Sequence, residues 1–252
     1  MKLPPGARYA VILAIVAGLA LVTDWDTVVE NFFDQSIASE LFPEIVTVAL
    51  RNTLIYTVLA FTVGLTAGVV LALMRLSRVR PYRWLATVYI EIFRGLPAML
   101  VLFFIGYGIP IAFPGREIPG GIYGQVALGL GIVSSAYIAE TVRAGIQAVP
   151  KGQYEAARTL GMSHHRAMFS IVLPQAFRLV IPPLTNEIVL LTKDSSLVFV
   201  LGSTPGLTDE LAKFARDGLN ASANATPLVV GGLMYLAITL PLSYLARRLE
   251  KK

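Results

Sequence analysis

Residues 155–174, EAARTLGMSHHRAMFSIVLP, form a partly charged segment between two long apolar runs. Helix-forming residues lead to Gly161, and glycine accepts the left-handed backbone that commonly ends a helix. Ser163 can cap a second helix, which we expect Pro174 to end. The stretch therefore predicts a short helix, a tight turn and a second helix. Such a pair, held between two membrane spans, can pass the movement of a partner protein into the membrane.

The composition is that of an integral membrane protein. Of the 252 residues, 55% are hydrophobic and 15% charged, and the mean hydropathy of +0.67 exceeds that of ordinary soluble domains. The net charge is +5, but Lys and Arg lie in short clusters between apolar runs, so nucleic acid is not an expected partner. The chain has no cysteine, which excludes disulfides, thiolate metal sites and cysteine catalysis.

Six apolar runs approach the roughly 20 residues that a helix needs to cross a bilayer. We expect spans at residues 9–23, 53–74, about 84–112, 122–142, about 176–201 and 227–246. The first run resembles a signal peptide, but no A-x-A cleavage pattern follows it, so we expect an uncleaved helix. Residues 24–50 carry acidic and apolar residues at helical spacing and predict an external amphipathic helix.

Proline and glycine residues within the spans predict how the helices are shaped. Pro97 in the third span and Pro182 and Pro183 in the fifth should kink or break their helices, which membranes tolerate where a helix lines a cavity. Gly64 and Gly68 form a GxxxG pattern in the second span. This pattern favours close packing inside the subunit over a dimer contact.

The basic residues orient the spans. Counted on alternate sides of the six spans, 15 of the 21 Lys and Arg residues share the side of the two termini, and 4 lie on the other side. Arg94 and Lys193 lie within spans. Because cytoplasmic loops carry the excess of positive charge, we expect both termini and residues 155–174 to be cytoplasmic.

The spacing inside this cytoplasmic stretch carries a resemblance. It resembles the EAA loop, by which membrane subunits of bacterial ABC importers dock on their ATPases, at Glu155, Ala156, Ala157, Gly161, Ile171, Leu173 and Pro174. Around it, FRGLP at 93–97, AYIAETVRAGIQAVPKGQ at 136–153 and LTNEIVLLTKDSSL at 184–197 resemble the polar amino acid permease family of the histidine/glutamine type. The resemblance covers about residues 44–252 and departs at Leu96, where many relatives carry Thr.

The resemblance implies an all-α type I ABC importer transmembrane fold in the bacterial cytoplasmic membrane, with a five-helix core and an additional N-terminal helix. Residues 1–45 would form that helix and an external segment, and 46–252 the permease domain, with a coupling loop at 150–174. The implied partners, besides membrane lipid, are ATPase subunits that bind ATP and Mg²⁺, a second permease copy or paralogue, an extracytoplasmic solute-binding protein and an amino acid. No G-x-x-x-x-G-K-[ST] motif occurs, so we expect no cofactor and no ATP hydrolysis in this chain.

Polar residues within the fifth span are candidates for the substrate pathway, because ionisable groups inside a membrane usually face a cavity. Glu187 and Asp194 lie seven residues apart on one helical face, and their neighbours Asn186, Lys193, Ser195 and Ser196 complete the set. Lys193 would suit the carboxylate of an amino acid, and either acidic residue its ammonium group. An internal ion pair of Lys193 with Glu187 or Asp194, or a contact at a subunit interface, explains the same residues equally well.

Two further pairs lie near the cytoplasmic ends of the spans. Glu91 with Arg94 and Glu140 with Arg143 have the spacing of intrahelical ion pairs, which is the favoured interpretation. Glu140 also follows Tyr137 on one face, so these two residues and Arg94 are further candidates for the pathway. The adjacent His164 and His165 point in different directions on a helix and have no third ligand at useful spacing. We therefore expect neither a metal site nor a catalytic residue.

The leading interpretation is a permease subunit of an ATP-driven amino acid importer that works by alternating access. A permease for peptides or another small solute is an alternative, although it would lack the AYIAE and KDSSL stretches. A membrane-embedded enzyme, such as a lipid-modifying transferase, would need a convergent set of catalytic residues that the sequence does not show. Which amino acid is carried, and whether the second permease is identical, stay open.

Overall fold

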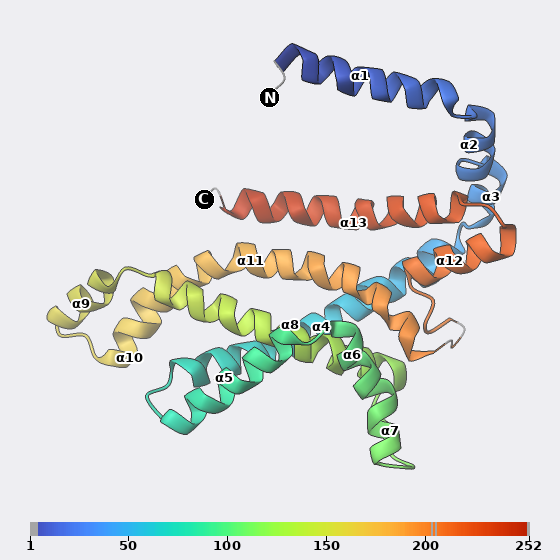
Figure 1. Cartoon of the computed structure of the whole chain (residues 1–252). Coiled ribbons are helices and arrows are strands. Elements are labelled where there is room, and N and C mark those ends of the chain that lie inside the picture. Colours follow the sequence, from blue (N-terminus) through green and yellow to red (C-terminus); the bar gives the residue numbers. More distant parts are fainter. Residues whose placement is uncertain (1–4, 203, 205, 251–252) are drawn as a thin grey trace.

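The computed structural model describes residues 5–202, 204 and 206–250, and every regular element in these ranges is helical. The all-α prediction is confirmed. Lys2, Lys251 and Lys252, which entered the charge count, lie outside the described residues. The α-helices, labelled as in Figure 1, are α1 Pro5–Val22, α2 Trp25–Phe32, α3 Gln35–Glu40, α4 Arg51–Leu76, α5 Arg80–Gly95, α6 Ala98–Phe103, α7 Ile109–Ala112, α8 Gly121–Ala148, α9 Lys151–Thr159, α10 His164–Ala167, α11 Leu173–Asp194, α12 Leu211–Ser222 and α13 Thr226–Glu250.

Four continuous helical stretches are long and apolar enough to cross a membrane: Ile45–Leu76, Gly121–Ala148, His164–Leu201 and Thr226–Leu249. Two bent pairs raise the number to six if each counts as one span. One pair joins Val11–Val22 to Trp25–Glu40 at 79°, and the other joins Arg80–Gly95 to Ala98–Ala112 at 105°. The number of predicted spans, six, agrees with this upper number. The third predicted span contains its bend, whereas the first, residues 9–23, ends where the 79° bend begins, so the bend joins it to the segment predicted to lie outside the membrane.

The segment before the second span differs from the single amphipathic helix predicted over residues 24–50. It consists of α2 and α3, which begin at separate caps, because the Asp24 carboxylate accepts from Thr27 N–H and the Asp34 carboxylate accepts from Ser36 N–H. Each cap satisfies free backbone donors and so starts a new helix. The second span then begins with a π-helical turn at Ile45, well before the predicted start at residue 53.

The prolines within the spans act differently from one another. Pro97 breaks the third span as predicted: α5 ends at Gly95, and Leu96 is extended with φ −91° and ψ 138°. This agrees with the rule that the residue before a proline avoids the helical region. Pro182 and Pro183 do not break the fifth span, because α11 continues through both. Packing of α11 between α8 and α13 maintains the helix despite the two missing N–H donors.

Pro174 does not end the second cytoplasmic helix, contrary to the prediction. Helical structure continues from His164 to Leu201. Between α10 and α11 the residues Met168–Val172 form a π-helical turn, and Pro174 follows in the first turn of α11. The π-helical turn changes the hydrogen-bond register just before Pro174, so the helix continues although proline lacks an N–H donor. The coupling loop is therefore continuous with the fifth span.

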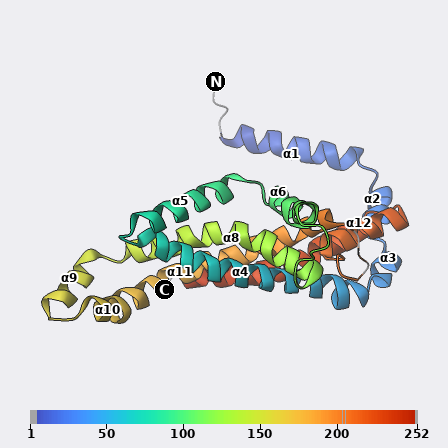
Figure 2. The same cartoon turned by 90° about the horizontal axis from the view of Figure 1, so that it is seen from below.

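The helices α4 and α8 run side by side along the bundle (Figure 2) and make its most extensive helix–helix contact. A Cβ atom on Gly64 would overlap Ser134 Oγ, and one on Gly68 would lie 2.9 Å from the backbone oxygen of Ser135. The GxxxG pattern thus serves packing inside the subunit, as the sequence predicted.

Gly68→Ala is expected to destabilise the chain by about 1–3 kcal/mol, because the added methyl group meets the backbone of α8, which cannot move aside alone. Gly232→Ala in α13 is the matched control, since a Cβ there meets nothing within 4 Å. Alanine has the higher helix propensity, so the control should be neutral or stabilising. Thermal unfolding of both variants in one detergent makes the comparison, and equal melting temperatures would contradict the close packing.

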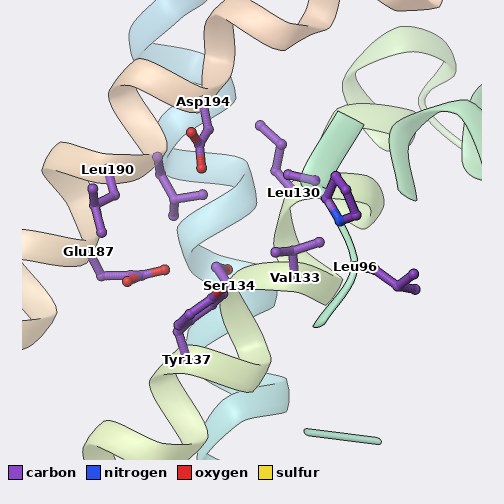
Figure 3. A pocket seen from close by; sticks show the side chains of 11 residues that line it. Leu96, Leu130, Val133, Ser134, Tyr137, Glu187, Leu190 and Asp194 are labelled. Carbon is purple, nitrogen blue, oxygen red and sulfur yellow. The ribbon is translucent and has the colours of Figure 1, made fainter. Parts of the chain in front are cut away.

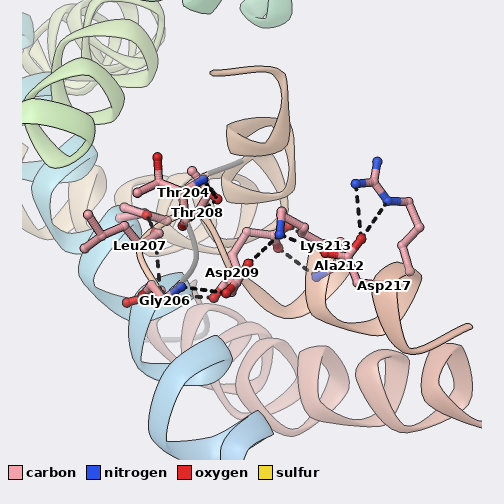
Figure 4. Close-up of polar contacts among 12 residues, drawn as sticks. Thr204, Gly206, Leu207, Thr208, Asp209, Ala212, Lys213 and Asp217 are labelled. Carbon is pink, nitrogen blue, oxygen red and sulfur yellow. Dashed lines mark hydrogen bonds and ion pairs between the residues drawn. The ribbon is translucent and has the colours of Figure 1, made fainter. Parts of the chain in front are cut away.

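The end of the bundle opposite α9 and α10 is fixed by polar contacts around α12 (Figure 4). Lys213 is nearly buried, and its ammonium group donates to Asp209 and, at 2.8 Å, to Asp217. This hydrogen bond holds the pKa of the Asp217 carboxyl below its usual value. The buried Glu210 carboxylate caps α12 and accepts at 2.8 Å from Tyr235 Oη of α13. These contacts connect α12 to the last span.

Candidate functional site

A cavity of about 330 Å³ lies where the break in the third span meets α8 and α11 (Figure 3). The broken backbone at Leu96 and Pro97 forms one wall, which confirms that the helix break lines a cavity. The full lining is Leu96, Pro97, Ala98, Leu130, Val133, Ser134, Tyr137, Glu187, Leu190, Leu191 and Asp194.

Three of the predicted pathway residues meet in this cavity. Glu187 and Asp194 line it from α11, and Tyr137 lines it from α8 together with Ser134 (Figure 3). Both carboxylates are half-buried. Within the part of the chain that the structure describes, no Lys, Arg or His lines the cavity. The cavity is mostly apolar, with a few polar groups that include two acids, and is suited to a cationic group on a small ligand.

The other polar residues of the fifth span do not line the cavity. Lys193 and Asn186 are exposed, and within the described residues no ion pair joins Lys193 to Glu187 or Asp194. The internal ion pair weighed as an alternative is therefore not formed. Ser195 is buried and donates to the backbone oxygen of Thr192 at 2.8 Å, and Ser196 is half-buried. Neighbouring residues of a helix face different directions, which separates these side chains from the cavity.

Glu140 belongs to an ion-pair network instead of the cavity lining. Its carboxylate accepts from Arg143 at 2.7 Å, which confirms the predicted intrahelical pair, and also from Arg75 of α4. The Arg75 guanidinium lies 3.9 Å from the Glu91 carboxylate of α5. The network joins three helices, so Glu140 positions them and does not line the described pathway.

The predicted pair of Glu91 with Arg94 is wrong. Arg94 lies with its guanidinium carbon 5.7 Å from the centre of the Tyr137 ring, and Tyr137 Oη donates to the backbone oxygen of Arg94 at 3.4 Å. A cation over an aromatic face is a favourable contact. Arg94 therefore contacts a cavity residue from the α5 side without lining the cavity itself.

The coupling loop has the predicted helix, turn and helix (Figure 1). Gly161 has φ +80°, its N–H donates to Arg158 O, and Met162 N–H donates to Ala157 O, which together form a Schellman motif. Ser163 caps α10 by accepting from Arg166 N–H. The two turn predictions, at Gly161 and Ser163, are confirmed.

Exposure divides the residues of the EAA pattern into two groups. Glu155 and Ala156 are exposed, whereas Ala157 is 4% exposed and packs inside the helix pair. Only one side of α9 faces away from the following helix, so Ala156 is open to a partner and Ala157 is not. Of the remaining positions, Pro174 is exposed, Gly161 is exposed in the turn, and Ile171 and Leu173 are half-buried.

Leu160 and Phe169 form the apolar surface of this loop, with exposed fractions of 84% and 67%. Neither residue belongs to the EAA pattern, so the resemblance did not predict Leu160. The missed signal is its position directly before the turn glycine, where a side chain lies beyond the end of its own helix. Tyr154 Oη and His164 Nδ1, 2.8 Å apart, connect the two helices. In the part of the chain described here, no three His, Asp or Glu side chains gather as a possible metal site.

A bundle of membrane-length helices with an interior cavity and a helix pair at one end defines the class of protein, a subunit of a membrane transporter. Residues 64–252 match the family model described as "Binding-protein-dependent transport system inner membrane component". The chain belongs to this family. It is therefore a multi-pass inner-membrane transport subunit and has no ATPase role of its own.

Curated relatives are permease proteins of amino acid transporters. "Probable glutamine ABC transporter permease protein GlnM" of Bacillus subtilis (strain 168) is 41% identical over 206 residues, which cover 79% of this chain and 91% of the relative. The arginine transport system permease protein ArtQ of the same strain is 37% identical over 81% of this chain and 90% of its own length.

Solved structures show the same fold. An amino acid ABC transporter crystallised with histidines matches with a TM-score of 0.74 and 34% identity, over 85% of this chain and 96% of that one. A chain of the MetNI methionine ABC transporter matches with a TM-score of 0.57 and 21% identity, over 79% and 89% of the two chains, which supports the fold alone. The fold is that of type I ABC importer permeases, as the resemblance implied.

Proposed function

We propose that the chain forms the membrane pathway of an ATP-driven importer of polar amino acids. The cavity that joins Glu187, Asp194, Tyr137 and Ser134 is the observation that carries this proposal. Its volume of about 330 Å³ is at the lower end of the range for small-molecule sites. The glutamine and arginine permeases among the relatives support a free amino acid as the substrate.

Two carboxylates in a largely apolar cavity would bind the ammonium group that every amino acid carries. Charge-assisted hydrogen bonds are stronger than neutral ones, and a low-dielectric environment strengthens them further. The Tyr137 and Ser134 hydroxyls would form hydrogen bonds with the remaining polar atoms of the amino acid, as donors or as acceptors. Because the helix is broken at Pro97, this wall of the cavity lies between two separate helical segments, α5 and α6. Alternating access would open the cavity to one side of the membrane at a time.

The proposed partners follow from the surfaces that the chain leaves open. ATPase subunits, which bind ATP and Mg²⁺, would dock on the coupling loop. A second permease copy or paralogue, with lipid, would cover α1. Its residues from Val11 to Val22 are all exposed, and it lies apart from the bundle in Figures 1 and 2. A solute-binding protein would deliver the amino acid to the opposite end. In this arrangement the membrane is the bacterial plasma membrane and both termini are cytoplasmic.

Glu187→Gln and Asp194→Asn are each expected to raise the KM for amino acid uptake by about 10-fold or more, because a hydrogen bond to a charged group contributes about 1.5–3 kcal/mol. Uptake by the complete complex in proteoliposomes is the measurement. Glu187→Asp, which retains the carboxylate, is the control, and its KM for uptake should rise less than that of Glu187→Gln. Normal uptake in both neutral variants would rule out this cavity as the substrate site.

Ligand-stimulated ATP hydrolysis tests the proposed function as a whole. The reconstituted complex with its solute-binding protein is screened against single amino acids and dipeptides. Stimulation by amino acids is expected. Stimulation by dipeptides alone would favour a peptide permease, and full uptake by this chain without any ATPase would contradict the proposal.

A further inference from the structure

A second hollow lies at the end of the bundle that bears the coupling loop. This groove, of about 620 Å³, runs between the last turn of α8, the first half of α11 and the end of α13. It shares no lining residue with the cavity around Glu187. The groove is lined by Ala148, Val149, Pro150, Gln175, Arg178, Leu179, Pro182, Pro183 and Leu249.

The groove changes from polar to apolar along α11. Gln175 and Arg178 lie toward the coupling loop, and Leu179, Pro182 and Pro183 follow toward the middle of the span. At ~1.5 Å per residue, Pro183 lies about 7.5 Å deeper than Arg178. The groove therefore presents a cation at its outer end and apolar surface below it, the polarity of a phospholipid.

Helix ends place Arg178 at the level of the lipid headgroups. The helix α8 ends at Ala148, and α13 carries Arg247 and Arg248 in its last turn. Figure 1 shows these two ends on the same side of the bundle as α9 and α10. Basic residues near the ends of spans mark the membrane–water interface, where long cationic side chains reach the headgroups.

The charge of the groove is positive. Arg178 is exposed, and the described residues that line the groove include neither Asp nor Glu. The nearest polar neighbour in the lining is Gln175, whose amide donates to the backbone oxygen of Ile171 at 2.9 Å. A planar guanidinium binds a phosphate through two parallel hydrogen bonds, which suits Arg178 to a phosphate-bearing ligand.

We propose that this groove binds an anionic phospholipid, with its phosphate on Arg178 and its acyl chains along Leu179, Pro183 and Leu249. The occupant would also contact Pro150, the residue that caps α9, and so would lie at the joint between α8 and the coupling loop. Anionic lipid at this joint would stabilise the contact of α8, α11 and α13 beneath the coupling helices. Coupling between ATP hydrolysis and uptake therefore depends on the anionic lipid content of the membrane.

The test uses the complete transporter in nanodiscs of phosphatidylcholine that contain a minor fraction of phosphatidylglycerol. Native mass spectrometry counts the phosphatidylglycerol retained after release from the disc. Arg178→Gln is expected to reduce the apparent affinity for phosphatidylglycerol about fivefold, the effect of one basic group near an anionic surface. Arg178→Lys, which keeps the positive charge, should retain most of the affinity for phosphatidylglycerol. The control is Arg80→Gln, because Arg80 is exposed on the same predicted side and does not line the groove.

Leu179→Trp is a second variant that fills the groove without changing its charge, and it should also displace the lipid. Unchanged retention in both Arg178→Gln and Leu179→Trp would overturn the proposal. So would equal retention of phosphatidylcholine and phosphatidylglycerol by the unaltered complex, the result expected if another subunit covers the groove. Displacement of phosphatidylglycerol by millimolar free amino acid would assign the groove to substrate instead.

Discussion

Leu160→Asp is expected to abolish coupled transport and leave the permease folded. Leu160 lies at the tip between α9 and α10, with 84% of its surface exposed, so the substitution removes no internal packing. A bulky apolar side chain at a protruding tip, with Phe169 nearby in the chain and also exposed, is the expected centre of a docking contact. A carboxylate at this position would lose its water on docking, which is unfavourable. Residues at the centre of a contact each contribute about 2 kcal/mol or more to the binding free energy.

The measurement is binding of the ATPase subunits and substrate-stimulated ATP hydrolysis in the reconstituted complex. A loss of 2 kcal/mol corresponds to about 30-fold weaker association at 25 °C. Leu160→Met keeps an apolar side chain of similar size and should behave like the unaltered chain. Both variants should melt at the unaltered temperature, which separates docking from folding. Normal hydrolysis and uptake with Leu160→Asp would show that the ATPase binds elsewhere.

The coupling loop shows which part of a structure local sequence determines. Gly161 and Ser163 were predictable because a helix cap depends on the few residues beside it. The effect of Pro174 was not predictable, since it depended on the π-helical turn that precedes this residue. Burial of Ala157 also depended on how α9 packs against the following helix. Such packing involves residues beyond the range of a local motif.

The residues of the cavity also divide into those that local sequence predicts and those that it does not. Glu187 and Asp194 were found together because residues seven apart share a helical face. Lys193 and Ser195 were assigned to the same site, but a step of one residue rotates the side chain by about 100° around the helix. The apolar walls came from other helices, for instance Leu130 of α8. Leucine occurs throughout the spans, so no local pattern distinguishes a wall of the cavity.

Glu140→Gln is expected to cause the largest loss of stability among the polar substitutions considered. The Glu140 carboxylate accepts from the guanidinium groups of Arg75 and Arg143. The exposed fractions of the three side chains are 20% for Glu140, 21% for Arg75 and 26% for Arg143. Removal of its charge would leave these two cations close together between helices. Loss of one partner from a buried ion pair costs about 3–5 kcal/mol, and partial exposure here favours the lower figure of about 3 kcal/mol. Denaturant or thermal unfolding in detergent measures the loss.

Two comparisons isolate the network from a general effect of the substitution. Glu91→Gln should cost less than ~1 kcal/mol, because the Glu91 side chain is 63% exposed and 3.9 Å from Arg75. The double variant Glu140→Gln with Arg75→Gln should regain part of the stability, since it removes the repulsion along with the attraction. Equal losses for Glu91→Gln and Glu140→Gln would contradict the network. Because α8 leads from Tyr137 in the cavity through Glu140 to the coupling loop, the single variant should also reduce uptake per ATP hydrolysed.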